Sequence, residues 1–223
     1  GVGPTILATS VLLLGETVEY FVDGKKQVEA PYARRQVLDF GQKVGEREVF
    51  LLSLPEIMTS HQVFAAPSVS AYFGTSPGVW NTMMQLMAKY LPKPLLQSRD
   101  FANGLAGLIM PLVRAVDKLV GETTAMRVDV KYENGKTSSS LFVHPKTPHS
   151  AGAATCAFAD AVLNGQVPPG VHFPEEDCVL GGEEDKYKQF FEVASEGAQT
   201  FALAQAPWRI GTTPKQMGMG IYL

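Results

Sequence analysis

Residues 124–143 carry the pattern that most constrains the fold. From Met126 to Tyr132 apolar residues alternate with charged ones, Asn134-Gly135 follows, and a second extended stretch then runs back. Strict alternation is typical of a strand with one buried face, and Asn-Gly is a preferred two-residue hairpin turn. The sequence therefore predicts a β-hairpin that has one wetter face.

Residues 98–120 carry the second clear pattern. Apolar side chains recur at steps of three and four, which indicates a helix with one buried stripe. The stripe comprises Phe101, Leu105, Leu108, Ile109, Leu112, Val116 and Leu119. Pro111 lies within it and is expected to kink the helix.

The remaining patterns alternate between strand and helix and set the fold class. Strands are expected at 18–22, 49–54 and 69–73, helices at 79–90, 149–163 and 187–201, and loops at 23–42 and 165–182. Several helices with one tight hairpin predict an α+β fold, with a mixed β-sheet covered by helices mainly on one face. The other face, expected near Leu51 and Tyr72, is too apolar to lie bare in water, so the sequence predicts a homodimer formed through the sheet.

Composition indicates the number of domains and narrows the classes of binding partner. The chain has 223 residues, 45% of them hydrophobic and 18% charged, which predicts a single globular domain over residues 1–223. A net charge of -3 supplies no basic field, so nucleic acid is not an expected partner. The apolar run at 6–14 is too short to span a membrane, which takes about 20 residues. The chain also begins in an apolar helix pattern with no lead-in, as expected for the C-terminal part of a larger protein.

The two cysteines, Cys156 and Cys178, lie in apolar sequence without metal-type spacing. This favours reduced thiols over a disulfide, and therefore an intracellular, reducing compartment. The cytoplasm is expected, with a plastid as the alternative.

Glycine pairs at the two ends of the chain suggest a nucleotide site, but the spacing does not support one. Gly1-Val2-Gly3 and Gly218-Met219-Gly220 both lack the third glycine of G-x-G-x-x-G, and no P-loop occurs. No cofactor is expected to be bound by this chain itself.

The histidines suggest a metal or acid–base site. One group, in FVHPKTPHSAG and GVHFPEEDCV, comprises His144, His149, His172, Glu175 and Glu176. A metal site there is one reading. The other reading is structural: the first segment is a strand-to-helix loop and the second is a solvated turn. The prolines in both segments favour this reading. No G-x-S-x-G or HExxH motif points to a hydrolase.

Two further sets are candidates for substrate binding. Tyr32, Arg34 and Arg35 lie in APYARRQVLDFG, where adjacent arginines can hold a carboxylate or phosphate and a tyrosine can donate to the same ligand. Ser60 and His61 are expected on a short helix between two strands, a place that often lines a cleft. The alternatives are that the two arginines are solvated surface charges and that His61 is a structural histidine with its hydrogen bonds made inside the fold.

Several strings together resemble the saccharopine dehydrogenase-like oxidoreductases, in the part that follows their N-terminal Rossmann domain. They are GVGPTILATSVLLLGE, PYARRQVLDFG, LPEIMTSHQVFAAPSVSAYFGTSP, MRVDVKYENGK and AGAATCAFADAVLNGQVPPGVHFPEE. The last string has His172 where the resemblance leads us to expect tryptophan. The resemblance covers most of the chain and transfers no catalytic residue.

The resemblance implies the substrate-binding and dimerisation domain of an NAD(P)-dependent oxidoreductase that acts on a small molecule. NAD(P) would belong to the intact parent protein, so this chain alone is not expected to catalyse the reaction. The alternative is a non-catalytic interaction module that keeps the fold without the cofactor domain.

Overall fold

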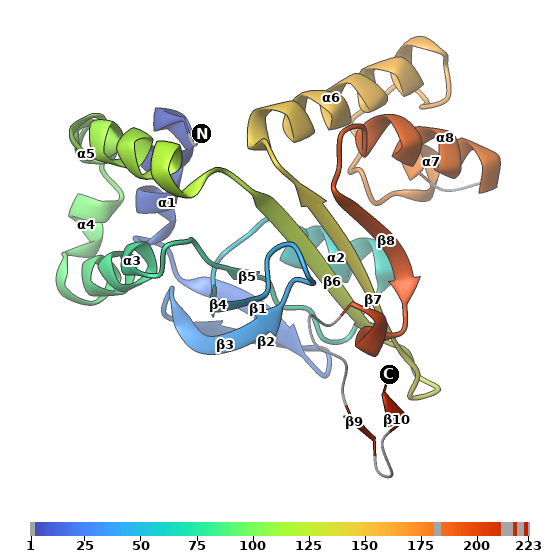
Figure 1. The fold of residues 1–223 in the computed structure, drawn as a ribbon, viewed down its shortest axis with the longest axis horizontal. Helices are drawn as coiled ribbons and strands as arrows, with labels where there is room; N and C mark the ends of the chain where they lie inside the picture. The colour runs from blue at the N-terminus through green and yellow to red at the C-terminus, as the bar shows by residue number, and fades with distance from the viewer. Residues whose placement is uncertain (1–2, 181–183, 211–215, 218–220, 223) are drawn as a thin grey trace.

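A computed structural model describes residues 3–180, 184–210, 216–217 and 221–222. Helices and strands are both well represented in it (Figure 1), and the predicted α+β class is confirmed. The helices are α1 (Pro4–Leu13), α2 (Glu56–Phe64), α3 (Val79–Tyr90), α4 (Lys93–Leu96), α5 (Arg99–Val120), α6 (Thr147–Leu163), α7 (Asp177–Leu180), α8 (Glu184–Ala194) and the 3-10 turn η1 (Pro207–Arg209). The strands are β1 (Val18–Val22), β2 (Lys25–Glu29), β3 (Ala33–Asp39), β4 (Glu46–Leu51), β5 (Tyr72–Phe73), β6 (Thr124–Lys131), β7 (Thr137–His144), β8 (Thr200–Gln205), β9 (Gln216–Met217) and β10 (Ile221–Tyr222).

The strands form separate small sheets rather than the one mixed sheet expected. Their orders are β1-β2, β3-β4-β5, β6-β7-β8 and β10-β9, and every strand pair in the described residues is antiparallel. Antiparallel partners need only a short turn, whereas parallel partners need a long crossover. Asp23 and Gly24, both at positive φ, form such a turn between β1 and β2. The expected loop at 23–42 therefore contains two strands.

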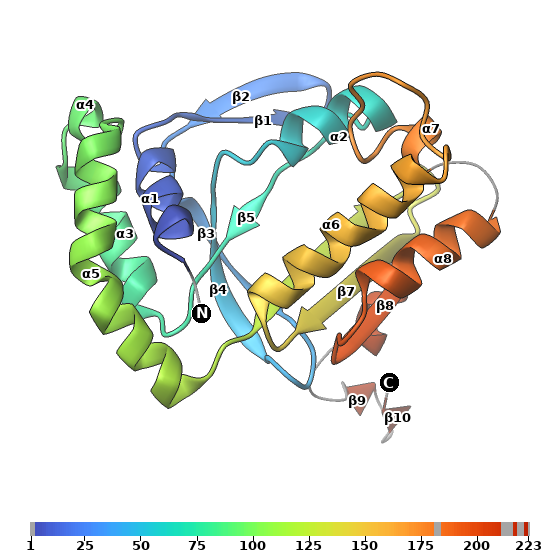
Figure 2. The same ribbon diagram turned by 90° about the horizontal axis from the view of Figure 1, so that it is seen from above.

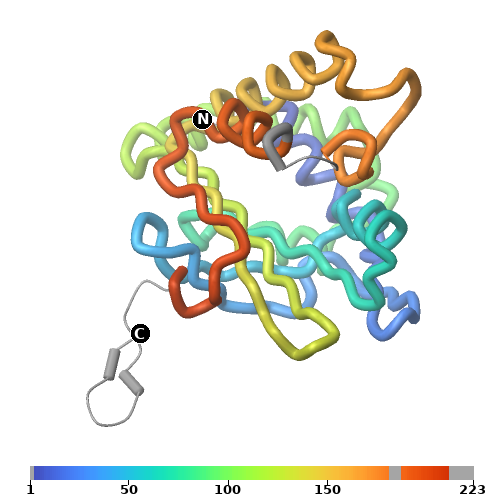
Figure 3. The backbone as a smooth tube through the Cα atoms, turned by 90° about the vertical axis from the view of Figure 1, so that its right-hand side faces the viewer, coloured from blue at the N-terminus to red at the C-terminus, as the bar shows by residue number. Residues whose placement is uncertain are grey.

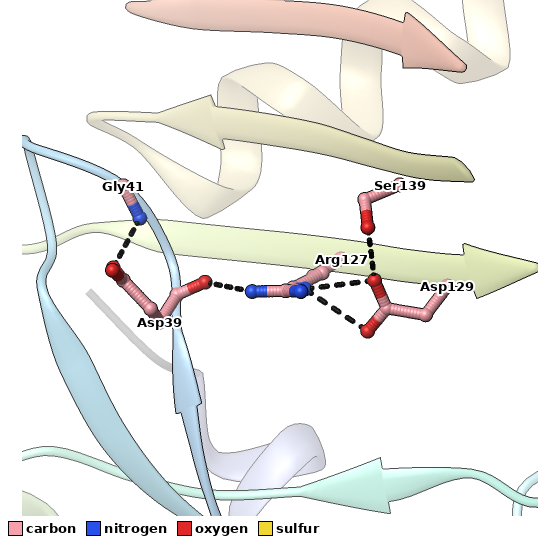
Figure 4. Close-up of polar contacts among 5 residues, drawn as sticks. All are labelled: Asp39, Gly41, Arg127, Asp129 and Ser139. Atoms are coloured by element: carbon pink, nitrogen blue, oxygen red, sulfur yellow. Dashed lines mark hydrogen bonds and ion pairs between the residues drawn. The ribbon is translucent and has the colours of Figure 1, made fainter. Parts of the chain in front are cut away.

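The predicted hairpin is confirmed, but its faces are reversed. β6 and β7 pair in continuous register from Thr124↔His144 to Lys131↔Thr137. Arg127 of β6 points inward, toward β3 (Figure 4): its Nη1 donates to the carbonyl oxygen of Asp39 at 2.5 Å, and its Nε lies 3.0 Å from both carboxylate oxygens of Asp129. Asp129 and Lys131, on the same face of the strand, are exposed. The apolar residues that alternate with them are exposed to solvent.

The core is built around β4. Phe50 packs with α1 and α5, Leu51 packs with β1 and Ile57 of α2, and Val49 packs against β7. Leu51 is fully buried, so the expectation that it lies on an uncovered sheet face is wrong. Separate sheets explain the difference, because each face of β4 meets another layer rather than an open side.

The helices gather in two groups. Helix α1 packs on α5 at one end of the molecule, and α6 packs on α8 beside the sheet β6-β7-β8 (Figure 2). Figures 1 and 3 both show α6 and α8 on the side of this sheet away from β1 and β2. Phe191 of α8 stacks on Phe201 of β8 with ring centroids 5.5 Å apart. The last helix, expected over 187–201, ends at Ala194, and residues 200–205 are a strand.

Helix α5 confirms the second prediction and corrects its buried stripe. The hydroxyl of Ser98 accepts a hydrogen bond from the backbone N–H of Phe101 at 3.3 Å and caps the helix. The buried residues are Ala102, Ala106, Met110 and Val113. Small alanines let α1 approach closely, and Leu108 and Leu119 of the expected stripe are 78% and 86% exposed. Among the described helices, none combines the length and apolar character needed to cross a membrane.

Candidate functional site

Tyr32 lies in the core. Its backbone N–H donates to the carbonyl of Leu51 at 2.9 Å, and its ring stacks on Phe50 with centroids 5.2 Å apart. The hydroxyl is buried and has no hydrogen-bond partner among the described residues, and burial raises the pKa of Tyr32 to about 12. Tyr32 thus packs like an apolar residue in this structure.

Arg34 and Arg35 lie on the surface and already have carboxylate partners. The Arg34 Nε donates to Oε1 of Glu29 at 2.8 Å, and its guanidinium lies 4.9 Å from the centre of the Tyr20 ring. Arg35 pairs with Glu48 of the neighbouring strand. The register of β3 shifts between Ala33 and Gln36, and such a bulge re-aims side chains. An anionic ligand would have to compete with Glu29 or Glu48 for these two arginines.

Ser60 and His61 lie on α2, as predicted, away from the arginines. The His61 ring stacks on Phe21 with centroids 3.6 Å apart, and its Nδ1 donates to the carbonyl of Ala66 at 2.8 Å. Arg34 lies over Tyr20, the neighbour of Phe21 in β1. Successive side chains of a strand point to opposite faces. The strand therefore separates Arg34 from His61, and the predicted substrate-binding residues do not form one site here.

The expected histidine and glutamate group is also divided. His144 is buried, its Nδ1 accepts from the backbone N–H of Lys146 at 2.9 Å, and its Nε2 donates to the carbonyl of Glu196 at 3.2 Å. His149 is exposed on α6. Glu175 accepts a hydrogen bond from the hydroxyl of Thr59 on α2 at 2.7 Å. His144 is thus a satisfied structural histidine.

His172 and Glu176 do lie together, and Cys178 joins them. These three are the group of possible metal ligands found among the described residues, with ligand atoms within 4.8 Å of one another. Sequence reasoning missed Cys178 because it searched for histidine pairs one helical turn apart. The available signal was His-x-x-x-Glu-x-Cys across the end of a loop and the first turn of α7.

A cavity of about 590 Å³ lies where α1 meets β1, beside the start of α2 and the short α4. Its lining includes the charged residues Glu16, Glu19 and Lys93. Gly15 forms part of the wall: its carbonyl accepts from the Gln97 amide at 3.1 Å, and a side chain at position 15 would collide with Gln97. No motif marks these residues, which come from segments far apart in the sequence.

One described strand-to-helix junction, between β5 and α3, carries two glycines but lacks the spacing of a dinucleotide site. The junction between β5 and α3 has Gly74 and Gly78, but in a G-x-x-x-G spacing on an antiparallel strand. The backbone N–H and the hydroxyl of Thr75 both donate to the buried Asn81 side chain at 2.8 Å, so this N–H is not free for a pyrophosphate. Gly1-Val2 and Gly218-Met219-Gly220 lie outside the described residues.

Searches against protein-family models, curated proteins and solved structures find no match to this chain.

Proposed function

We propose that this chain is the substrate-binding and dimerisation domain of a saccharopine dehydrogenase-like, NAD(P)-dependent oxidoreductase, and that it does not catalyse the reaction alone. One observation carries the dimerisation half: an uncovered apolar row on β6. The row consists of Met126, Val128, Val130 and Tyr132, all exposed. β6 is also an edge strand, whose outer backbone groups have no strand partner in the described residues.

A second copy is the occupant that fits this apolar row. Folded domains in water rarely leave a contiguous apolar patch bare, and an edge strand can pair with an identical strand across a two-fold axis. The two copies would then form one continuous antiparallel sheet, in which the two apolar rows lie side by side on one face. Arg127 is held inward by Asp39 and Asp129, so we place Arg127 between the layers of each copy rather than in the interface.

The substrate half of the proposal rests on the cavity beside α4. Glu16, Glu19 and Lys93 give it charges of both signs, which suits a small polar molecule that itself carries both. Arg34 and Arg35 would assist only by exchanging their present carboxylate partners for a ligand. The dinucleotide, NAD or NADP, would be held by a Rossmann domain of the parent protein. The exposed leucines of α5 offer that domain a surface to cover.

A non-catalytic interaction module is the alternative function. The internal pairing of Arg34 with Glu29 and of Arg35 with Glu48 favours it, because these arginines need no ligand. The location proposed for either function is a reducing compartment, the cytoplasm or a plastid. The support is that Cys156 and Cys178 are both free and exposed.

Light scattering at micromolar concentration tests the dimer. We expect twice the monomer mass for the unmodified chain and the monomer mass for Val128→Lys, because lysine on an edge strand opposes pairing. Val28→Lys is the matched control: it places the same change on β2, where the valine is 57% exposed against 58% for Val128. A monomer mass for the unmodified chain, or equal dissociation by both variants, would contradict the proposal.

Titration with NADPH tests the oxidoreductase assignment. We expect the parent protein to bind NADPH saturably and the present chain to show no binding tighter than about 100 µM, roughly -5.5 kcal/mol. Binding by neither would leave the interaction module as the function. Tight binding by the present chain would contradict the statement that it holds no cofactor.

A further inference from the structure

Three side chains of different chemistry meet where the loop after α6 runs into α7. Nδ1 of His172 lies 2.9 Å from Oε2 of Glu176 and 3.3 Å from Sγ of Cys178, and the sulfur lies 3.5 Å from the same carboxylate oxygen. Imidazole nitrogen, carboxylate oxygen and thiolate sulfur are all ligands that proteins use for zinc. The three atoms form a small triangle, which can be compared with known metal geometry.

The triangle is close in size to one face of a tetrahedral zinc site. Zinc bonds of about 2.0–2.3 Å at tetrahedral angles place neighbouring ligand atoms roughly 3.3–3.6 Å apart. The two edges that involve Cys178, 3.3 and 3.5 Å, fall in that range. The edge between His172 and Glu176 is shorter, at 2.9 Å, because a hydrogen bond joins these two atoms. A cation that replaces the shared proton would require a movement of only a few tenths of an ångström.

The loop holds the triangle from both sides. The second carboxylate oxygen of Glu176 accepts the backbone N–H of Phe173 at 3.0 Å, and Glu175 ties the loop to Thr59 of α2. Gly170, at φ +148, lets the imidazole of His172 lie against the backbone, because a Cβ there would be 2.8 Å from Nε2.

Hydrogen bonding within the loop leaves a polar atom unused. Nε2 of His172 is buried and has no partner among the described residues. This atom lies beside Gly170 and is not one of the three that form the triangle, so a metal bound through Nδ1 would leave the imidazole proton on Nε2.

We propose that His172, Glu176 and Cys178 form a three-ligand site for a divalent transition metal of the zinc class, with the fourth position open to water. Neutral imidazole, one carboxylate and one thiolate contribute two negative charges, which balance a divalent cation. Cys178 is exposed, so the fourth position faces solvent. Three protein ligands and a water are the arrangement of zinc sites that act on substrates, whereas closed structural sites have four protein ligands. The site is separate from the proposed oxidoreductase function and does not depend on it.

Binding would form three bonds, from the metal to nitrogen, oxygen and sulfur. The thiol proton of Cys178 would leave to solvent, and the proton on Nδ1 of His172 would be replaced by one on Nε2, so that the imidazole stays neutral. Because the thiol must lose its proton to bind, metal affinity should increase with pH. Magnesium and calcium prefer oxygen ligands and should not compete.

Cobalt(II) is the probe that reports the thiolate directly. The purified chain, kept reduced, should bind one equivalent of Co²⁺ with a thiolate-to-cobalt charge-transfer band, and Zn²⁺ should remove the band while Mg²⁺ should not. Cys178→Ser should abolish the band and weaken Zn²⁺ binding at least tenfold, and His172→Phe should weaken it to a similar degree. Circular dichroism confirms that each variant is folded.

Two variants serve as controls. Cys156→Ser removes the other exposed thiol, and Glu175→Gln changes the neighbouring acid that contacts Thr59 rather than the triangle. Both should keep the cobalt spectrum and affinity of the unmodified chain. The site is overturned if the unmodified chain gives no thiolate band, if Cys178→Ser retains it, or if Cys156→Ser removes it.

Discussion

Replacing Tyr32 by phenylalanine should stabilise the chain. The side chain is 6% exposed, and its hydroxyl has no partner among the described residues. A buried polar group without a partner costs about 1–3 kcal/mol, while a phenylalanine ring fills nearly the same space against Phe50. The free energy of unfolding should therefore rise by about 1–2 kcal/mol. For a chain of this size, Tm should rise by roughly 2–8 °C.

Tyr20→Phe is the matched control. Tyr20 is also buried, at 2% exposed, but its hydroxyl donates to Oε1 of Glu29 at 3.1 Å. Losing this hydrogen bond removes a contact and leaves the carboxylate with one donor fewer, so this variant should be less stable than the unmodified chain. The two substitutions are chemically identical and should move Tm in opposite directions.

Urea and thermal unfolding at pH 7, followed by circular dichroism, give both values. An unchanged dependence of unfolding free energy on urea would show that the variants unfold from similarly compact states. If Tyr32→Phe lowers Tm as Tyr20→Phe does, the Tyr32 hydroxyl has a partner and the reasoning fails. Such a result would also revive Tyr32 as a residue that donates to a ligand.

Two further predictions concern the space around Gly74 and the ionisation of Tyr32. Gly74→Ala should destabilise the chain by about 1–3 kcal/mol, because an added Cβ would overlap the carbonyl oxygen of Glu48. Gly78→Ala is the control: its added Cβ would lie in open space, so its stability in urea should change little. Equal destabilisation by the two variants would contradict the overlap. Raising the pH above 10 should lower the free energy of unfolding of the unmodified chain more than that of Tyr32→Phe. The pKa of Tyr32 is about 12 in the folded chain against 10.0 for the free group, so its contribution to stability is complete below pH 10 and is lost as the pH rises toward 12, at a cost of about 2–3 kcal/mol. Urea midpoints from pH 8 to 12 should fall more steeply for the unmodified chain than for Tyr32→Phe, and parallel curves would show that Tyr32 is not the cause.

Local patterns predicted the elements of this fold well. The hairpin at β6 and β7 follows from alternation and Asn134-Gly135, and α3 and β1 have the bounds that periodicity indicates. These signals lie within one segment, so a single sequence contains them. The strands β2 and β3 were missed because their charged residues resemble a loop, although Asp23-Gly24 is itself a hairpin signal.

Which face of an element is buried could not be predicted in the same way. On α5, alanines face α1 and several leucines face solvent, because close helix packing selects small side chains over large ones. On β6, the inward position of Arg127 depends on a carbonyl of Asp39, 88 residues away. Such partners depend on the tertiary arrangement, so the periodicity of one segment cannot predict them.

The candidate sites show the same division. Sequence reasoning placed Arg34 and Arg35 as anion ligands because their type and adjacency suit that role, but their partners, Glu29 and Glu48, lie on neighbouring strands. His172 and Glu176 were identified because they are close in sequence. Cys178 was interpreted as a reduced thiol without metal-type spacing, and only the turn into α7 brings it to the imidazole.

The apolar row on β6 and the exposed leucines of α5 impose different demands on the proposed assembly. The row on β6 lies along an edge strand, and a second copy can place its own row beside it because the strand can pair antiparallel with an identical strand. The leucines on α5 lie on a different element, at the end of the molecule occupied by α1. A two-fold axis at β6 generates a single interface, and that interface does not include α5. Dimerisation through β6 therefore does not explain why the α5 surface is apolar. Under the proposed function that surface is left for a different partner, and the cofactor domain of the parent protein is the partner we assign to it.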